Sequence, residues 1–327
     1  MNAPIGHNLT KSFMLLICFF FGMILIIGTS DAEAAGTSGF TFLTIGEGAR
    51  PAGMGESFVA MADDVNSIYW NCAGLARVTR RELTSSFMQY VVDINTGYLG
   101  YVMPVKNGGI GIGVVYLDYG KIPESTIDDP TGSELGSFQP FDAAMIVSYG
   151  QKITRKLSLG ASVKGAYEEI KGYSASAAAM DAGLLYDLPV RNLKLGLAVK
   201  NVGVQTKAFI EETNSLPMIV DLGLGYSLLD QSLKLGANVY KQLDLNMKYN
   251  LGMEYAWNNC FFARLGYQSK GDQLKTGSSK DSMTGFTTGL GINFQNFKLD
   301  YAFVPFNELG ETHRISLGFV FGNSYAE

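Results

Sequence analysis

The chain has few of the residues on which enzymes and metal sites usually depend. Three cysteines and two histidines occur in 327 residues, and beyond residue 34 only Cys72, Cys260 and His313 remain. A single histidine excludes a multi-histidine metal site, and no G-x-S-x-G elbow supports a serine hydrolase. We therefore expect no cofactor and no enzymatic activity, and we interpret His313 as a polar residue at the start of the last strand.

Charged residues and long apolar runs are also scarce. Charged residues make up 17% of the chain and the net charge is −5, whereas about a quarter is typical of soluble domains. Nucleic-acid binding needs a basic surface, so no nucleic acid is expected as a partner. Beyond residue 34 no apolar run reaches 18 residues, so a membrane role would depend on strands and not on helices.

Residues 1–34 have the features of a secretory signal peptide. Lys11 supplies a positive charge, Phe13–Gly28 is an apolar run of 16 residues, and Ala32-Glu33-Ala34 offers small residues for cleavage after Ala34. A retained anchor is the alternative, but the run is shorter than the roughly 20 residues that span a bilayer. The mature protein is therefore expected to be exported.

From Leu83 onward, apolar residues recur at every second position. In 193–200, for example, Leu, Leu, Leu and Val alternate with Lys, Gly, Ala and Lys, which is the pattern of a half-buried strand. Units of about ten residues are typical of outer-membrane barrels. We predict fourteen strands, at 83–93, 95–105, 109–118, 138–150, 156–168, 175–188, 192–203, 217–229, 232–242, 246–257, 260–269, 283–294, 296–304 and 313–322.

The connections between these strands alternate in length. The even-numbered ones are short, and five of the seven odd-numbered ones are long: 119–137, 169–174, 204–216, 270–282 and 305–312. Bacterial barrels have short periplasmic turns and longer extracellular loops. The fold class predicted for residues 83–327 is therefore all-β, a closed transmembrane outer-membrane β-barrel of about 14 antiparallel strands. We expect the bacterial outer membrane as its location, with both termini periplasmic.

Residues 35–82 do not read as strands and are predicted to form an N-terminal hatch or plug in the lumen. Their central stretch is FLTIGEGARPAGMGESFVAMADDVNSIYWNCAGLA, Phe42–Ala76. The strand positions that alternate with the apolar ones are mostly Gly, Ala, Ser, Asn and Tyr. Such small, weakly polar residues suit a narrow lumen that holds a plug or an amphipathic ligand.

The stretch Phe42–Ala76 resembles the N-terminal signature of the PorV/PorQ family, an uncharacterised protein family related to FadL-type fatty-acid transporters, whose hatch reads GMG…A…DD…NPAGL. The segments Asn250–Tyr267 and Leu299–Leu317 also look like this family. The resemblance implies a fourteen-stranded outer-membrane barrel with a hatch. The family has a proline where this chain has Cys72, and loss of that proline removes a restriction on the turn.

Two functions follow from the resemblance. The first is a partner role in protein secretion or surface assembly of the type IX kind, with secretion-system or surface-attachment proteins as partners. The alternative is FadL-like transport of hydrophobic small molecules, through the hatch and a lateral opening, with a hydrophobic ligand or lipid in the lumen. Outer-membrane lipid is a partner in both. A membrane hydrolase that uses His313 is a third and weaker alternative.

Candidate site residues lie in the expected hatch. The glycines serve either as packing positions without a Cβ atom or as hinges, and the two aspartates either cap a helix or pair with a basic residue of the wall. Cys72 and Cys260 either form a disulfide between hatch and wall or remain two free thiols. The hatch and gating candidates are Gly53, Met54, Gly55, Asp63, Asp64, Asn71, Cys72 and Gly74.

Overall fold

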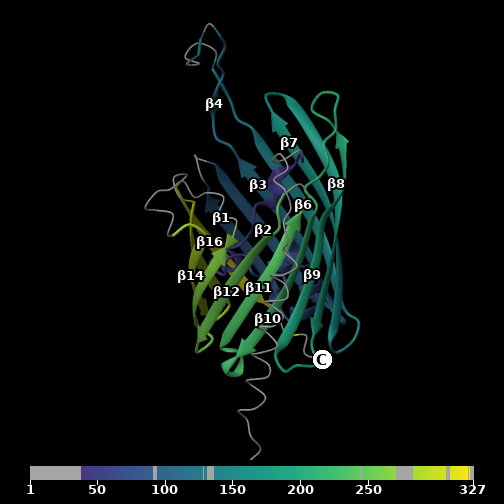
Figure 1. Ribbon diagram of the computed structural model, residues 1–327, viewed down its shortest axis with the longest axis vertical. Helices are drawn as coiled ribbons and strands as arrows, with labels where there is room; N and C mark the ends of the chain where they lie inside the picture. The colour runs from purple at the N-terminus through teal and green to yellow at the C-terminus, as the bar shows by residue number, and fades with distance from the viewer. Residues whose placement is uncertain are drawn as a thin grey trace, which may run out of the picture.

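The computed structural model describes residues 38–90, 94–127, 129–130, 136–243, 245–269, 283–306, 310–322 and 324. Fourteen antiparallel strands close into a barrel, with each wall strand paired to its neighbours in the chain and β1 paired to β16 (Figure 1). The predicted fold class is confirmed. The expected signal peptide 1–34 and the expected loop 270–282 lie outside the described residues.

The wall strands agree one to one with the fourteen predicted segments. They are β1 (Arg81–Gln89), β2 (Asn95–Val105), β3 (Gly108–Asp118), β6 (Phe141–Lys152), β7 (Leu157–Ile170), β8 (Tyr173–Asp187), β9 (Leu193–Lys207), β10 (Ile219–Leu228), β11 (Leu233–Gln242), β12 (Lys248–Trp257), β13 (Phe261–Gln268), β14 (Phe286–Phe294), β15 (Phe297–Pro305) and β16 (Glu311–Phe321). A separate two-stranded hairpin, β4 (Ile122–Pro123) and β5 (Ser137–Phe138), lies in the β3–β6 connection.

Among the described residues, helical structure is limited to short turns. These are η1 (Thr41–Thr44), α2 (Ala49–Gly53), α3 (Ser67–Trp70), η2 (Cys72–Arg77) and η3 (Leu229–Gln231). Within the part of the chain that the structure describes, none of the helices has the length and apolar character needed to cross a membrane.

The outer face of the wall is apolar and the inner face is small and polar. Leu83 and Phe87 of β1 are exposed on the outer face, whereas Thr84 and Ser86 between them are buried. An apolar band of this kind is unfavourable in water and suits the hydrocarbon of a bilayer. Aromatic pairs occur near both ends of the strands, among them Trp257–Phe261 and Phe297–Phe319 at one end and Tyr116–Phe141 and Tyr249–Tyr267 at the other.

The two rims of the barrel differ in the length of their connections. The long connections share one rim, the loop rim. The short turns share the other, the turn rim, where Arg81 at the start of the wall pairs with Phe321 at its end.

Residues 169–174 were expected to form a long loop, but β7 and β8 continue to a tight turn at Lys171–Gly172. Both turn residues have positive φ angles of 49° and 81°, so the backbone reverses within two residues. This hairpin stands above the neighbouring strands (Figure 1).

Residues 38–78, which we call the inner segment, pack within the ring of strands (Figure 1). The side chains of Met54, Phe58 and Leu75 are completely buried, and they share a hydrophobic cluster with Val102 and Ile146 of the wall. The segment therefore supplies the apolar core that the polar inner face of the wall does not supply by itself.

The inner segment approaches the wall backbone to backbone. A Cβ atom added to Gly266 of β13 would lie 2.0 Å from the backbone nitrogen of Gly55. Gly55 itself has a φ of 63° and donates its N–H to Thr287 Oγ1 at 3.0 Å. Only glycine fits such a contact without displacing backbone, so the glycines at both positions set how deeply the segment sits.

Candidate functional site

Two cavities lie against the inner segment, one toward each rim. The loop-side cavity, of about 190 Å³, is lined by Tyr69, Trp70 and residues at the loop-rim ends of β10, β11 and β12. The turn-side cavity, of about 260 Å³, is lined by Arg50 and Asp63 and by wall residues nearer the short turns. The inner segment therefore separates the lumen into two compartments of different chemistry.

Aromatic rings form one side of the loop-side cavity. Tyr69 and Trp70 meet edge to face with their centroids 5.4 Å apart. The hydroxyl of Tyr69 donates to the carbonyl of Leu43 at 2.8 Å, and the indole nitrogen of Trp70 donates to the carbonyl of Glu47 at 2.9 Å. Because each polar tip is bonded within the inner segment, the two rings are held in fixed positions.

Lys200 of β9 supplies positive charge to this cavity. Its Nζ lies 5.2 Å from the ring centroid of Tyr69 and 5.0 Å from that of Trp70, which is within the range of a cation–π interaction. The residue is only 6% exposed and lines the cavity. The ammonium group is thus held by aromatic faces beside the open space.

Arg314 and Asn250 also line this cavity. Arg314 Nη1 donates to the carbonyl of Gly46, while Arg314 Nε and Asn250 Oδ1 are buried without a hydrogen-bond partner among the described residues. An unsatisfied buried polar atom costs about 1–3 kcal/mol. Both atoms have almost no accessible surface, so a molecule in the cavity would reach them only after neighbouring side chains shift.

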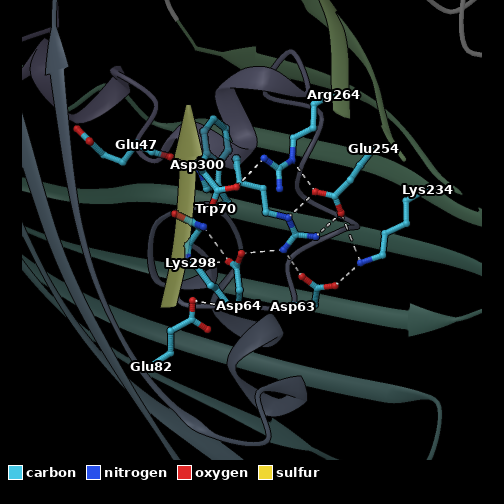
Figure 2. Close-up of polar contacts among 12 residues, drawn as sticks. Glu47, Asp63, Asp64, Trp70, Glu82, Lys234, Glu254, Arg264, Lys298 and Asp300 are labelled. Atoms are coloured by element: carbon cyan, nitrogen blue, oxygen red, sulfur yellow. Dashed lines mark hydrogen bonds and ion pairs between the residues drawn. The ribbon is translucent and has the colours of Figure 1, made fainter. Parts of the chain in front are cut away.

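The turn-side cavity is built around Arg50 of α2. Arg50 Nη1 donates to Asp63 Oδ1 at 2.6 Å and to Asp64 Oδ2 at 2.7 Å. Its Nε and Nη2 donate to the two oxygens of Glu254, each at 2.9 Å. Glu254 also accepts from Arg264 at 2.7 Å. The carboxylates of Asp63, Asp64 and Glu254, which Figure 2 labels, all pair with this guanidinium. This cluster fastens the inner segment to β12.

The cluster continues along the wall. Lys234 of β11 pairs with Asp63 at 2.9 Å, Arg264 pairs with Asp300 of β15 at 2.6 Å, and Lys298 pairs with Glu82 of β1 at 2.9 Å (Figure 2). Burial alone would raise the pKa of Asp63, but the charges of Arg50 and Lys234 hold it well below its usual range. Asp63 is therefore ionised at neutral pH, and the network is charged on both sides.

The predicted candidates Gly53, Met54, Gly55 and Gly74 occupy tight contacts. A Cβ on Gly53 would lie 2.9 Å from Gly289 Cα, and a Cβ on Gly74 would lie 2.5 Å from the carbonyl oxygen of Ala62. The side chain of Met54 is fully buried. These contacts explain small residues by packing, and a hinge role stays a prediction.

The aspartates and Asn71 hold the segment by polar contacts. The expected helix cap by Asp63 or Asp64 is wrong, because the N-cap of α3 is Asn66 and it makes no side-chain cap. Asp64 Oδ1 instead accepts from the backbone N–H of Asn66 at 2.8 Å, before the helix begins. Asn71 Nδ2 donates to the carbonyls of Val59 at 2.8 Å and Leu184 at 3.1 Å, so this side chain ties the segment to β8.

The disulfide hypothesis is wrong in this structure, since Cys72 and Cys260 are both free thiols. Cys72 packs against Gly160 and Gly183 of β7 and β8, while Cys260 lies in the turn between β12 and β13. Four strand spacings of about 4.8 Å separate β8 from β12, too far for a disulfide. Burial raises the pKa of the Cys72 thiol to about 11, which leaves it unreactive at neutral pH.

His313 lies apart from both cavities. Its Nδ1 is 2.7 Å from the hydroxyl of Tyr301, its ring packs beside Phe303, and Glu311 is 3.6 Å from its Nε2. No serine is among these contacts in the described residues. The geometry gives the hydrolase alternative no nucleophile beside this base.

Sequence reasoning missed the residues that dominate both cavities: Arg50, Lys200, Glu254, Arg264 and Arg314. Each is a charged residue at a position that the wall or the inner segment buries. The available signal was the alternation of strand faces. Glu254 stands two residues after the inward-facing Gly252, and Arg264 stands two residues before the inward-facing Gly266, so each shares the inward face of its strand. Assigning the inward face from its glycines would have placed these charges in the lumen.

A closed fourteen-stranded barrel with an apolar outer face and a filled lumen defines an outer-membrane β-barrel protein. Within that class, residues 26–184 match the profile of an uncharacterised protein family, UPF0164. Two proteins of Treponema pallidum (strain Nichols), both called UPF0164 protein, are similar. One is 25% identical over 214 residues, covering 60% of this chain and 50% of its own. The other is 28% identical over 174 residues, covering 49% and 43%. The chain thus spans about half the length of the curated relatives it matches.

Solved structures with the same fold include the toluene transporter TodX of Pseudomonas putida, with a TM-score of 0.56 and 12% identity over 89% of this chain and 97% of that one. A FadL homologue of Pseudomonas aeruginosa has a TM-score of 0.53 and 13% identity, over 84% of this chain and 98% of that one. The CymD monoaromatic hydrocarbon channel has a TM-score of 0.57 and 13% identity, over 86% of this chain and 98% of that one. At such identity the likeness shows the fold alone. The expected relation to an uncharacterised family and to the FadL-type fold is confirmed, and the PorV/PorQ name stays a prediction.

Replacing Arg50 by methionine should release the inner segment from the wall. The change leaves Asp63, Asp64 and Glu254 buried without their shared cation, which we expect to destabilise the folded state by about 3–5 kcal/mol. Thermal unfolding in detergent and protease cleavage within 38–78 measure the effect. The matched control is Arg77→Met, which removes a pair with the partly exposed Asp187 and should cost about 1 kcal/mol or less. Equal effects of the two changes would contradict the role assigned to Arg50.

Glu47 should make the stability of the protein fall as the pH rises. Burial raises its pKa to about 8, against the opposing charge of Arg314 and a hydrogen bond from Thr96. An unfolded glutamate has a pKa of about 4.3, so the stabilisation is complete below that value and is lost as the pH rises through about 8. Glu47→Gln should flatten the dependence of the unfolding temperature between about pH 5 and pH 9. An unchanged slope, equal to that of the exposed-loop control Glu211→Gln, would refute the assignment.

Proposed function

We propose that the protein is a passive outer-membrane channel for small amphipathic molecules. In this proposal the inner segment is the hatch and the loop-side cavity is the entry site. The observation that carries it is the joining of fixed aromatic rings and a buried ammonium group in one cavity at the loop rim. The loop rim would face outward and both chain ends would face the periplasm.

The cavity suits a ligand with an aromatic or other apolar body and one anionic group. Tyr69 and Trp70 provide apolar faces, the Lys200 ammonium lies over those faces, and Lys200 also interacts electrostatically with Asp221. Of the two carboxylates that line the cavity, Asp221 accepts from Asn238 at 2.7 Å and Glu56 lies 3.9 Å from Arg314. Lys200 therefore lies where the anionic group of a ligand would meet it, in competition with Asp221.

Passage through this barrel requires movement of the inner segment. The wall is hydrogen-bonded all round, and the inner segment stands between the two cavities. The Arg50 cluster lies on the turn side. On the loop side, Arg314 of the wall contacts Glu56 and the carbonyl of Gly46, so a ligand that enters there meets fewer ion pairs among the described residues. The names of the similar solved structures, a toluene transporter and a monoaromatic hydrocarbon channel, agree with this function.

Binding to the loop-side cavity can be measured through Trp70. Trp257 is the other tryptophan and is exposed on the outer wall, so Trp257→Phe leaves a single reporter. Phenylacetate should quench Trp70 saturably, and Lys200→Gln should raise its Kd about tenfold, equivalent to about 1.4 kcal/mol. Toluene, which has no charge, should be insensitive to that change, and the exposed Lys207→Gln is the matched control. Equal phenylacetate affinity in the Lys200 and Lys207 variants would contradict the site.

A second candidate is a PorV/PorQ-type partner in protein secretion or surface assembly. It is favoured by the hairpins that rise from the loop rim, since Glu124 beside β4 forms an ion pair with Lys171 at the tip of the β7–β8 hairpin. The ion pair links two projections, which Figure 1 shows rising separately from the loop rim.

Deletion of the gene separates the two candidates. A channel predicts normal surface proteins and slower uptake of aromatic acids, whereas a secretion partner predicts the loss of particular proteins from the cell surface and normal uptake. Complementation with Lys200→Gln should fail to restore uptake if the channel is correct. Full rescue of uptake by that variant would contradict the channel and leave the secretion role as the better explanation.

A further inference from the structure

Strand β9 extends past its neighbour β10 at the loop rim. The pairing of β10 with β9 ends at Ile219 and Lys200, whereas the pairing of β8 with β9 continues to Ser176 and Lys207. Residues 202–207 of β9 are therefore bonded to β8 on one side only. We call these six residues the β9 edge.

A bulge and a proline create this edge. Lys200 and Asn201 together stand opposite the single residue Asp181, because Met180 pairs with Val202 and Ala182 pairs with Val199. Such a bulge bends the strand and increases its twist. On the β10 side, Asn201 Nδ2 donates to the carbonyl of Pro217 at 3.1 Å. Proline has no N–H to continue a ladder, so pairing stops there.

The bulge is fixed by a buried polar cluster. Asn201 has a φ of 61°, and its backbone N–H donates to Asp181 Oδ1 at 2.8 Å. Lys164 Nζ lies 2.8 Å from both Asp181 Oδ2 and Asn201 Oδ1. All three residues are buried. The end of the β9–β10 ladder is therefore a built feature and not a frayed terminus.

The connection from β9 to β10 turns inward and leaves the β9 edge uncovered. Gly39 of the inner segment donates its N–H to the carbonyl of Ser215 at 3.0 Å, and Leu216 is buried in a cluster with Phe40 and Phe42. Where the connection meets β9 again, Asn214 N–H bonds the side chain of Gln205 and not its backbone. The backbone of the β9 edge thus has no ladder partner on this side among the described residues.

The composition of the edge favours pairing. The sequence Val202-Gly203-Val204-Gln205-Thr206 contains no charge and no proline before Lys207, and both valines are exposed, Val204 to 66%. Proteins usually block an exposed edge with lysine, proline or a covering segment. None of these devices interrupts the first five residues of this edge.

The loop-rim end of the edge lies at the level of the membrane surface, and residues 202–206 lie on the membrane side of that level. Lys207 is in register with Tyr167 through Ser176, and Tyr167 belongs to an outer-face aromatic row with Phe141 and Tyr116. Such rows mark the bilayer interface in barrels of this class. Unpaired backbone is not tolerated in hydrocarbon, and lipid tails cannot supply donors and acceptors at the spacing of a strand.

We propose that the β9 edge binds an extended segment of a partner polypeptide as an added strand. A row of alternating amide and carbonyl groups is complementary to another extended backbone. The side chains of Val202 and Val204 would select apolar residues at alternate positions, and the exposed Glu211 and Glu212 in the adjoining connection favour a segment with basic residues at its end. This proposal is independent of the small-molecule channel.

Amide hydrogen exchange of the full chain in detergent tests the proposal. The probe is a short peptide of alternating valine and threonine with lysine at both ends. We expect it to slow exchange in residues 202–207 at least about tenfold, with no change in β12. The double variant Val202→Lys and Val204→Lys should lose the protection, because charged side chains block edge pairing. Ile127→Lys, at an exposed site on the β4–β5 hairpin, is the matched control and should keep it.

A second probe separates backbone pairing from apolar contact in the unaltered protein. The same peptide N-methylated at every second residue keeps its side chains but lacks half of its donors, and it should give no protection. Equal protection by both peptides, or none by either, would overturn the proposal. Protection without peptide that grows with protein concentration would also overturn it, since the occupant would then be a second copy of this chain.

Discussion

The structure depends on one guanidinium group. Arg50 is the shared partner of Asp63 and Asp64 within the inner segment and of Glu254 in the wall. Without it three carboxylates would be buried together, which is unfavourable at the low dielectric of a filled lumen. With it, the inner segment and β12 become one charged unit, and the glycine contacts at Gly55 and Gly266 bring the two backbones close enough for that unit to form.

This arrangement makes the two sides of the inner segment unequal. On the turn side the segment is held by ion pairs that reach β11, β12, β13 and β15. On the loop side it presents Tyr69 and Trp70 to a cavity, and hydrogen bonds within the segment hold these two rings. A molecule arriving at the loop side therefore meets rings and a cation, whereas release of the segment requires charges to separate on the opposite side.

The fold could be predicted from the sequence because its signal is repetitive. Alternation in 193–200 identifies a strand without any knowledge of its neighbours, and the pattern recurs in each of the fourteen wall strands. The β7–β8 turn was not predicted, because Lys171 has a positive φ angle and lysine rarely adopts one. The site escaped for a different reason. Arg50 and Glu254 are 204 residues apart in the sequence, and neither local sequence pattern predicts that the two side chains are in contact.

Lys200 connects the two features that the sequence did not reveal. It is one of the two residues that the β9 bulge sets against Asp181, and its ammonium group lies over Tyr69 and Trp70 in the loop-side cavity. Asn201, the next residue, ends the pairing with β10 and begins the free edge. The same local distortion therefore turns a cation inward to the cavity and leaves a strand edge open outside. A change in the backbone at this bulge would alter both the position of the Lys200 side chain in the cavity and the geometry of the β9 edge, because a bulge fixes the direction of the side chains on either side of it.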